Sequence, residues 1–207
     1  MKTIQTWLTM IALLLCSITM SAQTFQVDGL RYTVLSSTDM TVSVQQGSAT
    51  PSGELIIPTT VTYEGTTYDV ISIGSSAFSG CTNLVSVTIP DSVTHIGVNA
   101  FEGCTGLAQE DGVTYVGNWI VACDESVSEV VCREGTIGIA NGAFEDCFHM
   151  KAITIPTSLD IIGDNAFCPY RIKDIYYAGS EKRWRRIRIG QFNNSLSDAT
   201  FHYNYVP

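Results

Sequence analysis

The stretch Ser72–Val93 reads SIGSSAFSGCTNLVSVTIPDSV, and the segment His95–Leu107 that follows it reads HIGVNAFEGCTGL. An isoleucine–glycine pair, an alanine–phenylalanine pair, a glycine–cysteine pair and a leucine occur in both segments in the same order. Phe78 and Phe101 are 23 residues apart, and so are the two cysteines and the two leucines. Agreement at several residue types indicates an internal repeat, and a period of roughly 20 to 50 residues is typical of repeat architectures.

The repeat continues along the chain. Four copies align on alanine–phenylalanine pairs that end at Phe78, Phe101, Phe144 and Phe167. The spacings between these phenylalanines are 23, 43 and 23 residues, so the middle gap contains one period and an insertion of 20 residues. This insertion, at about residues 108–131, contains two β-rich runs around a turn, and it is predicted to form a hairpin that projects from or widens the array.

Each repeat has two parts. In residues 84–90 (LVSVTIP) and 150–156 (MKAITIP), apolar side chains alternate with small polar ones, which predicts a short strand with one buried face. The proline that closes each run cannot donate to a strand ladder and is expected to end the strand. The alanine–phenylalanine segment is expected to form a short helical turn, and Gly74, Gly97 and Gly163 are expected to permit a turn conformation.

A single coil of this kind cannot bury its apolar side alone, so neighbouring coils have to stack. The sequence therefore predicts a β-rich α/β solenoid whose core consists of columns of like residues. The expected columns are Ile73, Ile96, Ile139 and Ile162; Phe78, Phe101, Phe144 and Phe167; and Leu84, Leu107 and Met150.

The pattern I-x-x-I-G-x-x-A-F-x-G-C-x-x-L-x-x-V-x-I-P-x-S-V resembles the BspA-type leucine-rich repeat, a family of bacterial surface and secreted proteins. The resemblance covers residues 70–107 and 136–175. It implies a right-handed solenoid with a parallel sheet on one face, and it implies adhesion to host proteins as the function.

The two ends of the chain differ from the repeats. Lys2, an apolar run at residues 10–16 and small residues before Gln23 are typical of a cleaved export signal. A membrane anchor is the alternative, but the run is too short to span a bilayer. The expected regions are a signal peptide at residues 1–22, an antiparallel N-terminal β cap at 23–69, repeats at 70–179 and a C-terminal cap at 180–207.

Composition and motifs limit the classes of function. The formal net charge is −9, and it becomes −10 without the signal because Lys2 is lost, which disfavours nucleic-acid binding. The chain has no C-x-x-C pair, no H-E-x-x-H motif, no G-x-S-x-G elbow and no glycine-rich phosphate loop. We therefore expect a non-enzymatic protein with no cofactor and no metal, and no transmembrane segment after signal cleavage.

Six cysteines remain after signal cleavage, and an even number in an exported protein permits disulfides. Cys81, Cys104 and Cys147 share one repeat position, where free thiols serve as small buried hydrophobic groups. Cys123 and Cys132 flank the expected hairpin turn and are the candidate disulfide. Cys168 stands where the pattern breaks and has no assignment.

The side chains of the sheet that point away from the core are the candidate partner-binding surface. We expect a monomer, secreted or on the cell surface with the periplasm as an alternative, that binds a protein such as a host extracellular-matrix or surface protein. The candidate partner-binding residues are Ser86, Thr88, Ala152, Thr154, Asp174, Tyr176 and, from the insertion, Trp119.

Two other kinds of site are open. The aromatic residues Tyr115, Trp119, Tyr176 and Trp184 offer stacking platforms for a carbohydrate, although large aromatic side chains mostly pack in cores. Near the C-terminus, a basic cluster suits an anionic glycan or an anionic membrane surface, or it is the solvated face of a capping helix. This candidate patch consists of Arg183, Arg185 and Arg186, with Lys182 and Arg188 beside them.

Overall fold

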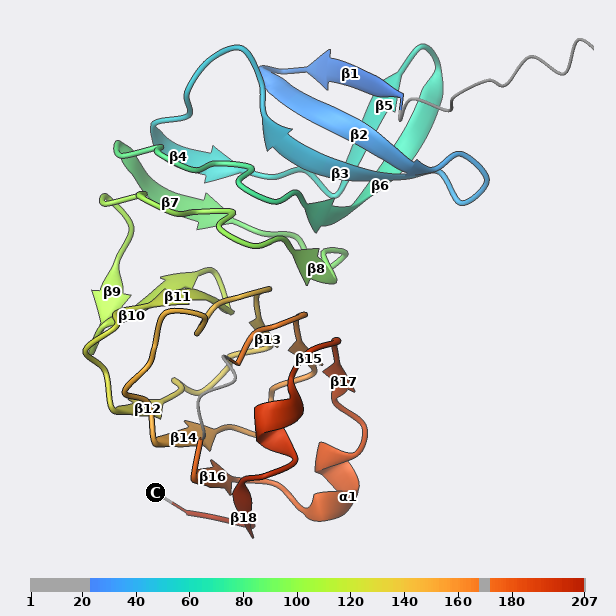
Figure 1. Ribbon diagram of the computed structural model, residues 1–207. Helices are drawn as coiled ribbons and strands as arrows, with labels where there is room; N and C mark the ends of the chain where they lie inside the picture. Colours follow the sequence, from blue (N-terminus) through green and yellow to red (C-terminus); the bar gives the residue numbers. More distant parts are fainter. Residues whose placement is uncertain (1–22, 168–171, 207) are drawn as a thin grey trace, which may run out of the picture.

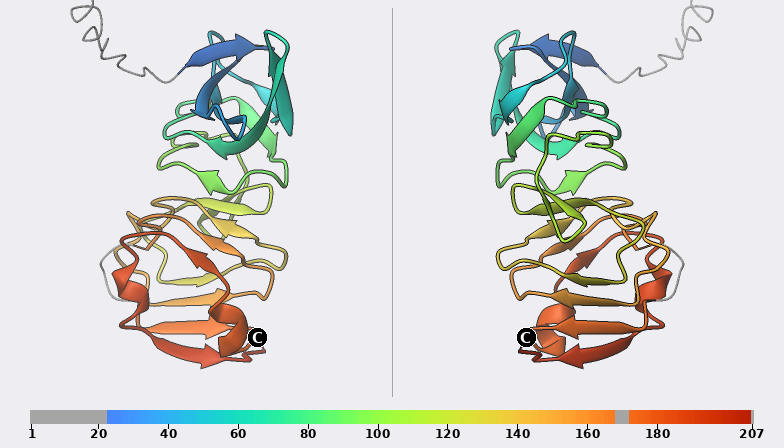
Figure 2. Two further views of the ribbon diagram at one scale, coloured as in Figure 1. Left: turned by 90° about the vertical axis from the view of Figure 1, so that its right-hand side faces the viewer. Right: turned by 90° about the vertical axis from the view of Figure 1, so that its left-hand side faces the viewer.

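The computed structural model describes residues 23–167 and 172–206, which form an elongated stack of β coils (Figures 1 and 2). The chain advances from the N-terminal strands at one end of the stack to the C-terminal strands at the other, so each coil lies beside its neighbours in sequence. The expected signal peptide at residues 1–22 and Cys168 lie outside the described residues. None of the helices in the described part of the chain has the length and apolar character needed to cross a membrane.

The N-terminal end of the stack is a mostly antiparallel sheet with the order β1-β2-β3-β6-β5. Its strands are β1 (Thr24–Val27), β2 (Leu30–Ser36), β3 (Thr41–Gln46), β5 (Thr60–Tyr63) and β6 (Thr66–Ile73). The β1–β2 hairpin turns at Asp28 and Gly29, with φ of 48° and 80°. Both central residues of this two-residue turn lie in the left-handed region, which explains the Asp-Gly sequence.

Beyond this sheet, strands of three to five residues on one side of the stack form parallel ladders. One ladder joins β4 (Gly53–Ile56) and β7 (Leu84–Thr88), and the other has the order β12-β14-β16-β18. The strands of the second ladder are β12 (Glu129–Val131), β14 (Ala152–Ile155), β16 (Asp174–Tyr177) and β18 (Thr200–Tyr203). The expected strands are therefore present at both repeats, but β7 and β12 belong to different sheets.

The opposite part of each coil also carries parallel pairing, in addition to the parallel sheet that the resemblance implied for one face. These strands have two residues each: β8 (His95–Ile96), β13 (Gly138–Ile139), β15 (Ile161–Ile162) and β17 (Arg188–Ile189). β8 pairs with β6, and β13, β15 and β17 pair in sequence order. The repeated isoleucines Ile73, Ile96, Ile139 and Ile162 thus supply both a backbone ladder and a buried core side chain.

The insertion is incorporated into the stack. Its strands are β9 (Gln109–Glu110), β10 (Val113–Val116) and β11 (Trp119–Cys123), and β10 is antiparallel to both neighbours. β11 then pairs in parallel with β13, which places Trp119 opposite Gly138 and Ile120 opposite Ile139. The segment therefore adds its three strands to the sheet that contains β13, β15 and β17.

The core contains the expected phenylalanine and isoleucine columns, each in two parts. The rings of Phe78 and Phe101 stack with centroids 5.5 Å apart, and those of Phe144 and Phe167 stack at 5.2 Å. The isoleucine column divides at the same place, because Ile120 of the insertion takes the position before Ile139. All four phenylalanines are at most 5% exposed.

The repeated glycines have a different physical role from the one expected. Gly97 and Gly163 do not adopt positive φ, so neither is required for a left-handed turn. A Cβ added to Gly97 would overlap the backbone of Ser75, and one added to Gly163 would lie 2.6 Å from the Asn141 nitrogen. Such contacts are shorter than carbon and nitrogen atoms tolerate, so glycine permits the close approach of successive coils.

Helix contributes little in the described residues, in contrast to the α/β expectation. The helical segments there are α1 (Glu181–Trp184) and the 3-10 turn η1 (Asn194–Leu196). The alanine–phenylalanine segments are tight turns, as in the bonds from the Ala77 N–H to the Gly74 carbonyl at 3.2 Å and from the Cys81 N–H to the Phe78 carbonyl at 3.2 Å. The fold is therefore a β-rich solenoid with almost no helix.

Candidate recognition surface

The sheet β12-β14-β16-β18 has an outward side whose residues form two rows across its four strands. Parallel pairing places Val131, Thr154, Tyr176 and His202 in one row and Glu129, Ala152, Asp174 and Thr200 in the other. The residues between them, such as Ile153 and Ile175, are buried in the core. We call these two rows the C-terminal face. It brings together the predicted residues Ala152, Thr154, Asp174 and Tyr176.

The other predicted residues of the sheet, Ser86 and Thr88, lie on β7 and are exposed. They pair with Glu54 and Ile56 of β4, and the Ile56 side chain is 70% exposed. We call these four residues the N-terminal face. In the described part of the chain no strand pairing joins β7 to β12, so the single surface expected from the sequence is two separate faces.

Aromatic and polar side chains gather at the last two strands of the C-terminal face. The rings of Tyr176 and His202 stack with centroids 4.5 Å apart and an interplanar angle of 14°. The Tyr205 ring lies 4.8 Å from that of Tyr176, and His202 Nε2 is 2.8 Å from Asp174 Oδ1. We call Asp174, Tyr176, His202 and Tyr205 the aromatic cluster.

The cluster combines flat apolar rings with a carboxylate and an imidazole, all of them partly or fully exposed. Rings of this kind bury a large area per residue at a low entropic cost, while the polar atoms can fix the orientation of what binds. Sequence analysis missed His202 and Tyr205. A signal for His202 was present, because TFHY at residues 200–203 has the alternation of DIYY at residues 174–177.

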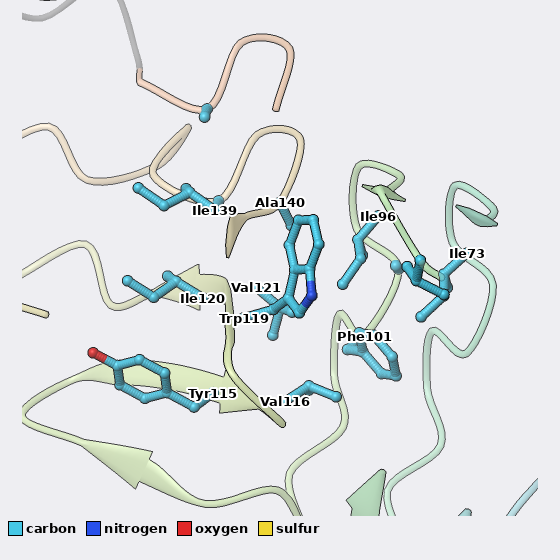
Figure 3. Close-up of a cluster of buried hydrophobic side chains, with 14 of the residues drawn as sticks. Ile73, Ile96, Phe101, Tyr115, Val116, Trp119, Ile120, Val121, Ile139 and Ala140 are labelled. Carbon is cyan, nitrogen blue, oxygen red and sulfur yellow. The ribbon is translucent and has the colours of Figure 1, made fainter. Parts of the chain in front are cut away.

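Trp119 does not belong to the surface, which corrects the prediction that it contacts a partner. Its side chain is 2% exposed and points into the core between the coils, near Ile96, Ile139 and Ala140 (Figure 3). Gly138 leaves room for the indole, since an added Cβ would overlap the ring. The indole therefore covers the junction between coils, as large aromatics usually do.

Two further aromatic residues predicted as sugar platforms are also buried. Tyr115 is 6% exposed, its hydroxyl accepts a hydrogen bond from the Arg133 N–H at 3.3 Å, and the Arg133 guanidinium lies 4.2 Å from the ring centroid. Trp184 is 8% exposed and packs edge-on against Tyr177 and Phe201. Tyr176 is the one predicted platform that lies on a surface.

The candidate anionic-ligand patch consists partly of paired charges. Arg183 reaches Asp160 Oδ1 at 2.5 Å, and Arg185 reaches Glu181 Oε1 at 2.5 Å one helical turn away. Arg186 is exposed and forms no ion pair within the described residues. Each neighbouring carboxylate reduces the positive potential, so this geometry favours a solvated capping helix over a site for an anion.

The candidate disulfide between Cys123 and Cys132 is absent, since both residues are free thiols. Cys132 is 5% exposed, and burial raises the pKa of its thiol to about 12. Cys81, Cys104 and Cys147 are free and buried, as expected for the repeat position. Within the described residues, no three His, Cys, Asp or Glu side chains are grouped so that they could hold a metal ion.

The stacked coils, their isoleucine and phenylalanine columns and the parallel strand ladders define a leucine-rich-repeat solenoid. The family model described as "BspA type Leucine rich repeat region" matches residues 59–171 with six copies, which is more than half of the chain. The chain belongs to the BspA-type leucine-rich-repeat family.

Several solved structures are similar to this chain. A leucine-rich cell surface protein from Faecalibacterium prausnitzii A2-165 has 23% sequence identity to this chain and a TM-score of 0.44. The match covers 89% of this chain and 55% of that protein. A leucine-rich repeat protein from Bacteroides capillosus ATCC 29799 has 26% identity and a TM-score of 0.41, with 86% of this chain and 98% of that one covered. The leucine-rich repeat protein of T. pallidum has 17% identity and a TM-score of 0.42, with 88% and 83% covered. No curated protein matches the chain.

Proposed function

We propose that this chain is a secreted or cell-surface recognition protein without enzymatic activity, and that it binds a protein partner through the C-terminal face. Membership of a leucine-rich-repeat family suggests protein–protein interaction. The observation that carries the proposal is the strand register, which places Asp174, Tyr176 and His202 side by side on one outward face. A host extracellular-matrix or cell-surface protein is the proposed partner, following the family resemblance.

The physical argument concerns where binding energy concentrates. A few aromatic side chains near the centre of an interface often supply most of the affinity, and polar neighbours supply the specificity. Tyr176 has this environment, since it lies between Thr154 and His202 in one row and has Asp174 beside it. The exposed Val131 extends the apolar part of the face toward β12.

The test measures binding of the purified chain to a panel of purified extracellular-matrix glycoproteins by surface plasmon resonance. Tyr176→Ala is expected to weaken a detected interaction by at least tenfold, because truncation of a central aromatic anchor costs about 2 kcal/mol. Phe192→Ala is the matched control, as this aromatic side chain is 71% exposed and lies outside the face. Equal losses in both variants would reject the C-terminal face as the binding surface.

Localisation needs a separate measurement. Protease added to intact cells of the source organism is expected to degrade the protein, whereas a periplasmic location would protect it until the outer envelope is opened. Protection in intact cells would contradict surface display and leave an internal role.

Carbohydrate binding is the second candidate, and the aromatic cluster is the observation that favours it. The earlier set of platforms is reduced to Tyr176, but the rings of His202 and Tyr205 lie against it. Aromatic faces beside a carboxylate suit a sugar ring, whose C–H groups stack while its hydroxyls hydrogen-bond. A glycan array separates the candidates, since a hit that disappears in Tyr176→Ala supports carbohydrate and an empty array supports a protein partner.

The two ends of the chain are proposed to act as caps that keep the protein monomeric. Residues 23–69 and 180–207 flank the repeats proposed at residues 70–179, and exposed edges of a stacked array invite association. Light scattering on the purified chain is expected to give the mass of one copy, and deletion of residues 23–49 is expected to cause aggregation. A stable dimer of the intact chain would contradict this role.

A further inference from the structure

Two thiols that are distant in sequence lie side by side at the junction of the insertion with the next coil. Cys123 ends β11, and Cys147 lies in the turn that follows Phe144. Each Sγ is 3.6 Å from the same atom, the carbonyl oxygen of Asp124. The sequence pattern did not predict this proximity, because it places Cys147 in the column of repeat cysteines and Cys123 in the insertion.

Cys147 shares its hydrogen-bond acceptor, the Asp124 carbonyl oxygen, with Cys123. A hydrogen bond with the Cys123 thiol, together with burial, raises the pKa of Cys147 above its ordinary value. Cys132 feels Cys123 only as a nearby charge, while burial is the main cause of its raised pKa. The geometry therefore favours a pairing different from the one that the sequence suggested.

Cys123 can be reached from solvent. Its side chain has intermediate exposure, whereas Cys147 is 3% exposed. A cavity of about 320 Å³ opens beside it, and Glu102 and Asp146 are among its lining residues while no lysine or arginine is. This volume accommodates a small molecule, and the acidic lining favours one that is neutral or cationic.

We propose that Cys123 and Cys147 form a disulfide bond by exchange with a neutral or cationic low-molecular-weight disulfide. The Cys123 thiolate attacks one sulfur of the reagent and releases the first reagent thiol, which leaves a mixed disulfide on Cys123. The Cys147 thiol then loses its proton and attacks the Cys123 sulfur, releasing the second reagent thiol. Two cysteine sulfurs are oxidised, the reagent disulfide is reduced to two thiols, and the two cysteine protons end on those thiols.

The bond would fix the insertion to the coil that follows it. Cys123 is the last residue of β11, and Cys147 leads into β14 of the C-terminal face. The bridge thus links the hairpin to the sheet that carries the proposed recognition surface. A closed loop of this length is expected to raise the melting temperature by roughly 5 °C or more.

The test treats the reduced, purified chain lacking residues 1–22 with cystamine, a cationic disulfide, and then blocks the remaining thiols. Cleavage after glutamate and after lysine or arginine separates the relevant cysteines, because Cys123 falls in residues 111–125, Cys132 in 130–133 and Cys147 in 146–151. Mass spectrometry is expected to find peptide 111–125 joined to peptide 146–151. Before the thiols are blocked, the intact protein is expected to have lost about 2 Da without gaining a cystamine half.

Two variants make the result decisive. Cys147→Ser is expected to stop at the mixed disulfide on Cys123, and Cys132→Ser is expected to form the same bridge as the wild type. Circular dichroism identifies variants that have not folded. The peptide map of the wild-type chain tests the proposal even if a variant does not fold. A bridge between peptides 111–125 and 130–133, or a mixed disulfide on Cys123 that never closes in the wild type, would overturn the proposal.

Discussion

The solenoid has two halves, one before and one after the insertion, and both are built from the same repeat. Strand pairing joins the coils within each half, whereas the contact between the halves is of a different kind. In the N-terminal half, β4 pairs with β7 and β6 with β8. In the C-terminal half, one ladder runs through β12, β14, β16 and β18 and the other through β11, β13, β15 and β17. Both ladders are interrupted at the insertion, where β9 and β10 lie between the halves (Figure 1).

Side-chain packing and a backbone hydrogen bond join the two halves at this junction. Trp119, Val116 and Phe101 pack there with Ile96 (Figure 3), and the Asn141 N–H donates to the Ile96 carbonyl at 3.0 Å. Inside each half, a lost side chain leaves the backbone ladder in place. At the junction no strand ladder joins the sheets in the described residues, so core substitutions there should affect the coupling of the two halves.

The largest effect is expected for Trp119→Ala. Removing a buried indole costs about 3–5 kcal/mol of unfolding free energy, from lost burial and the cavity that remains. Hydrogen exchange is expected to show faster exchange at β8 and β11, with protection of β14 and β16 largely retained. Trp184→Ala is the matched control, because its loosening should stay near α1. Uniform loss of protection along the chain in Trp119→Ala would contradict a separable junction.

Glycine substitutions test whether the close coil contacts are equivalent in the two halves. Gly97→Ala and Gly163→Ala are each expected to lose about 2–3 kcal/mol, because the new methyl group would overlap the backbone of the preceding coil. Gly74→Ala is the control at the same repeat position, since an added Cβ there lies 3.4 Å from its nearest neighbour, the Ser43 hydroxyl oxygen. Urea denaturation measures the three losses. A comparable loss in Gly74→Ala would show that coil spacing is not their cause.

The pH dependence of stability tests the contribution of one buried thiol, that of Cys132 in the C-terminal half. The pKa of Cys132 is about 12 in the folded chain because the thiol is buried, and it is about 8.5 when the chain is unfolded. The unfolded state therefore releases its proton first, so the stability present below about pH 8.5 falls as pH rises toward 12, by up to about 1.4 kcal/mol per pH unit. Cys132→Ala is expected to lose this component of the slope in urea titrations from pH 7.5 to 10. Parallel slopes for the variant and the wild type would contradict this account of the thiol.

The smallest effects are expected in the C-terminal segment. Arg185→Ala should leave the urea midpoint almost unchanged, because the ion pair of Arg185 with Glu181, four residues before it in α1, is exposed to solvent. The wild-type chain is expected to pass through a heparin column at roughly 0.15 M salt without retention. Retention that is lost when Arg183, Arg185 and Arg186 are changed to alanine would instead establish an anionic-ligand site there.

Periodicity predicted the coils because each coil packs against a copy of itself, so Phe78 and Phe144 had to meet phenylalanines of neighbouring repeats. The family assignment followed from the same residues. The insertion has no such copy. Its own sequence pattern therefore does not predict that Trp119 packs over Gly138 or that β11 pairs with β13. The division of the surface into two faces was for the same reason not predictable from the repeats.

The aromatic cluster was half predictable. Tyr176 and Asp174 lie in a strand that still shows the repeat pattern, so alternation placed them on the outward face. His202 and Tyr205 lie in the C-terminal segment. Alternation could have placed His202 on the outward face, but the ladder register and the ring contact of Tyr205 are needed to show that both lie beside Tyr176. The predicted pairing of Cys123 with Cys132 was wrong. Cys123 and Cys147 come close only because separate coils stack, and the spacing of cysteines along the sequence does not show this contact.

Because the N-terminal and C-terminal faces are separate, the number of repeats between them sets the distance from one face to the other. Duplication of one internal 23-residue unit would displace one face from the other by about one strand spacing, roughly 4.8 Å, and leave the chemistry of both unchanged. A partner that touches both faces at once would register that increment, whereas a partner held by the aromatic cluster alone would bind the lengthened molecule equally well.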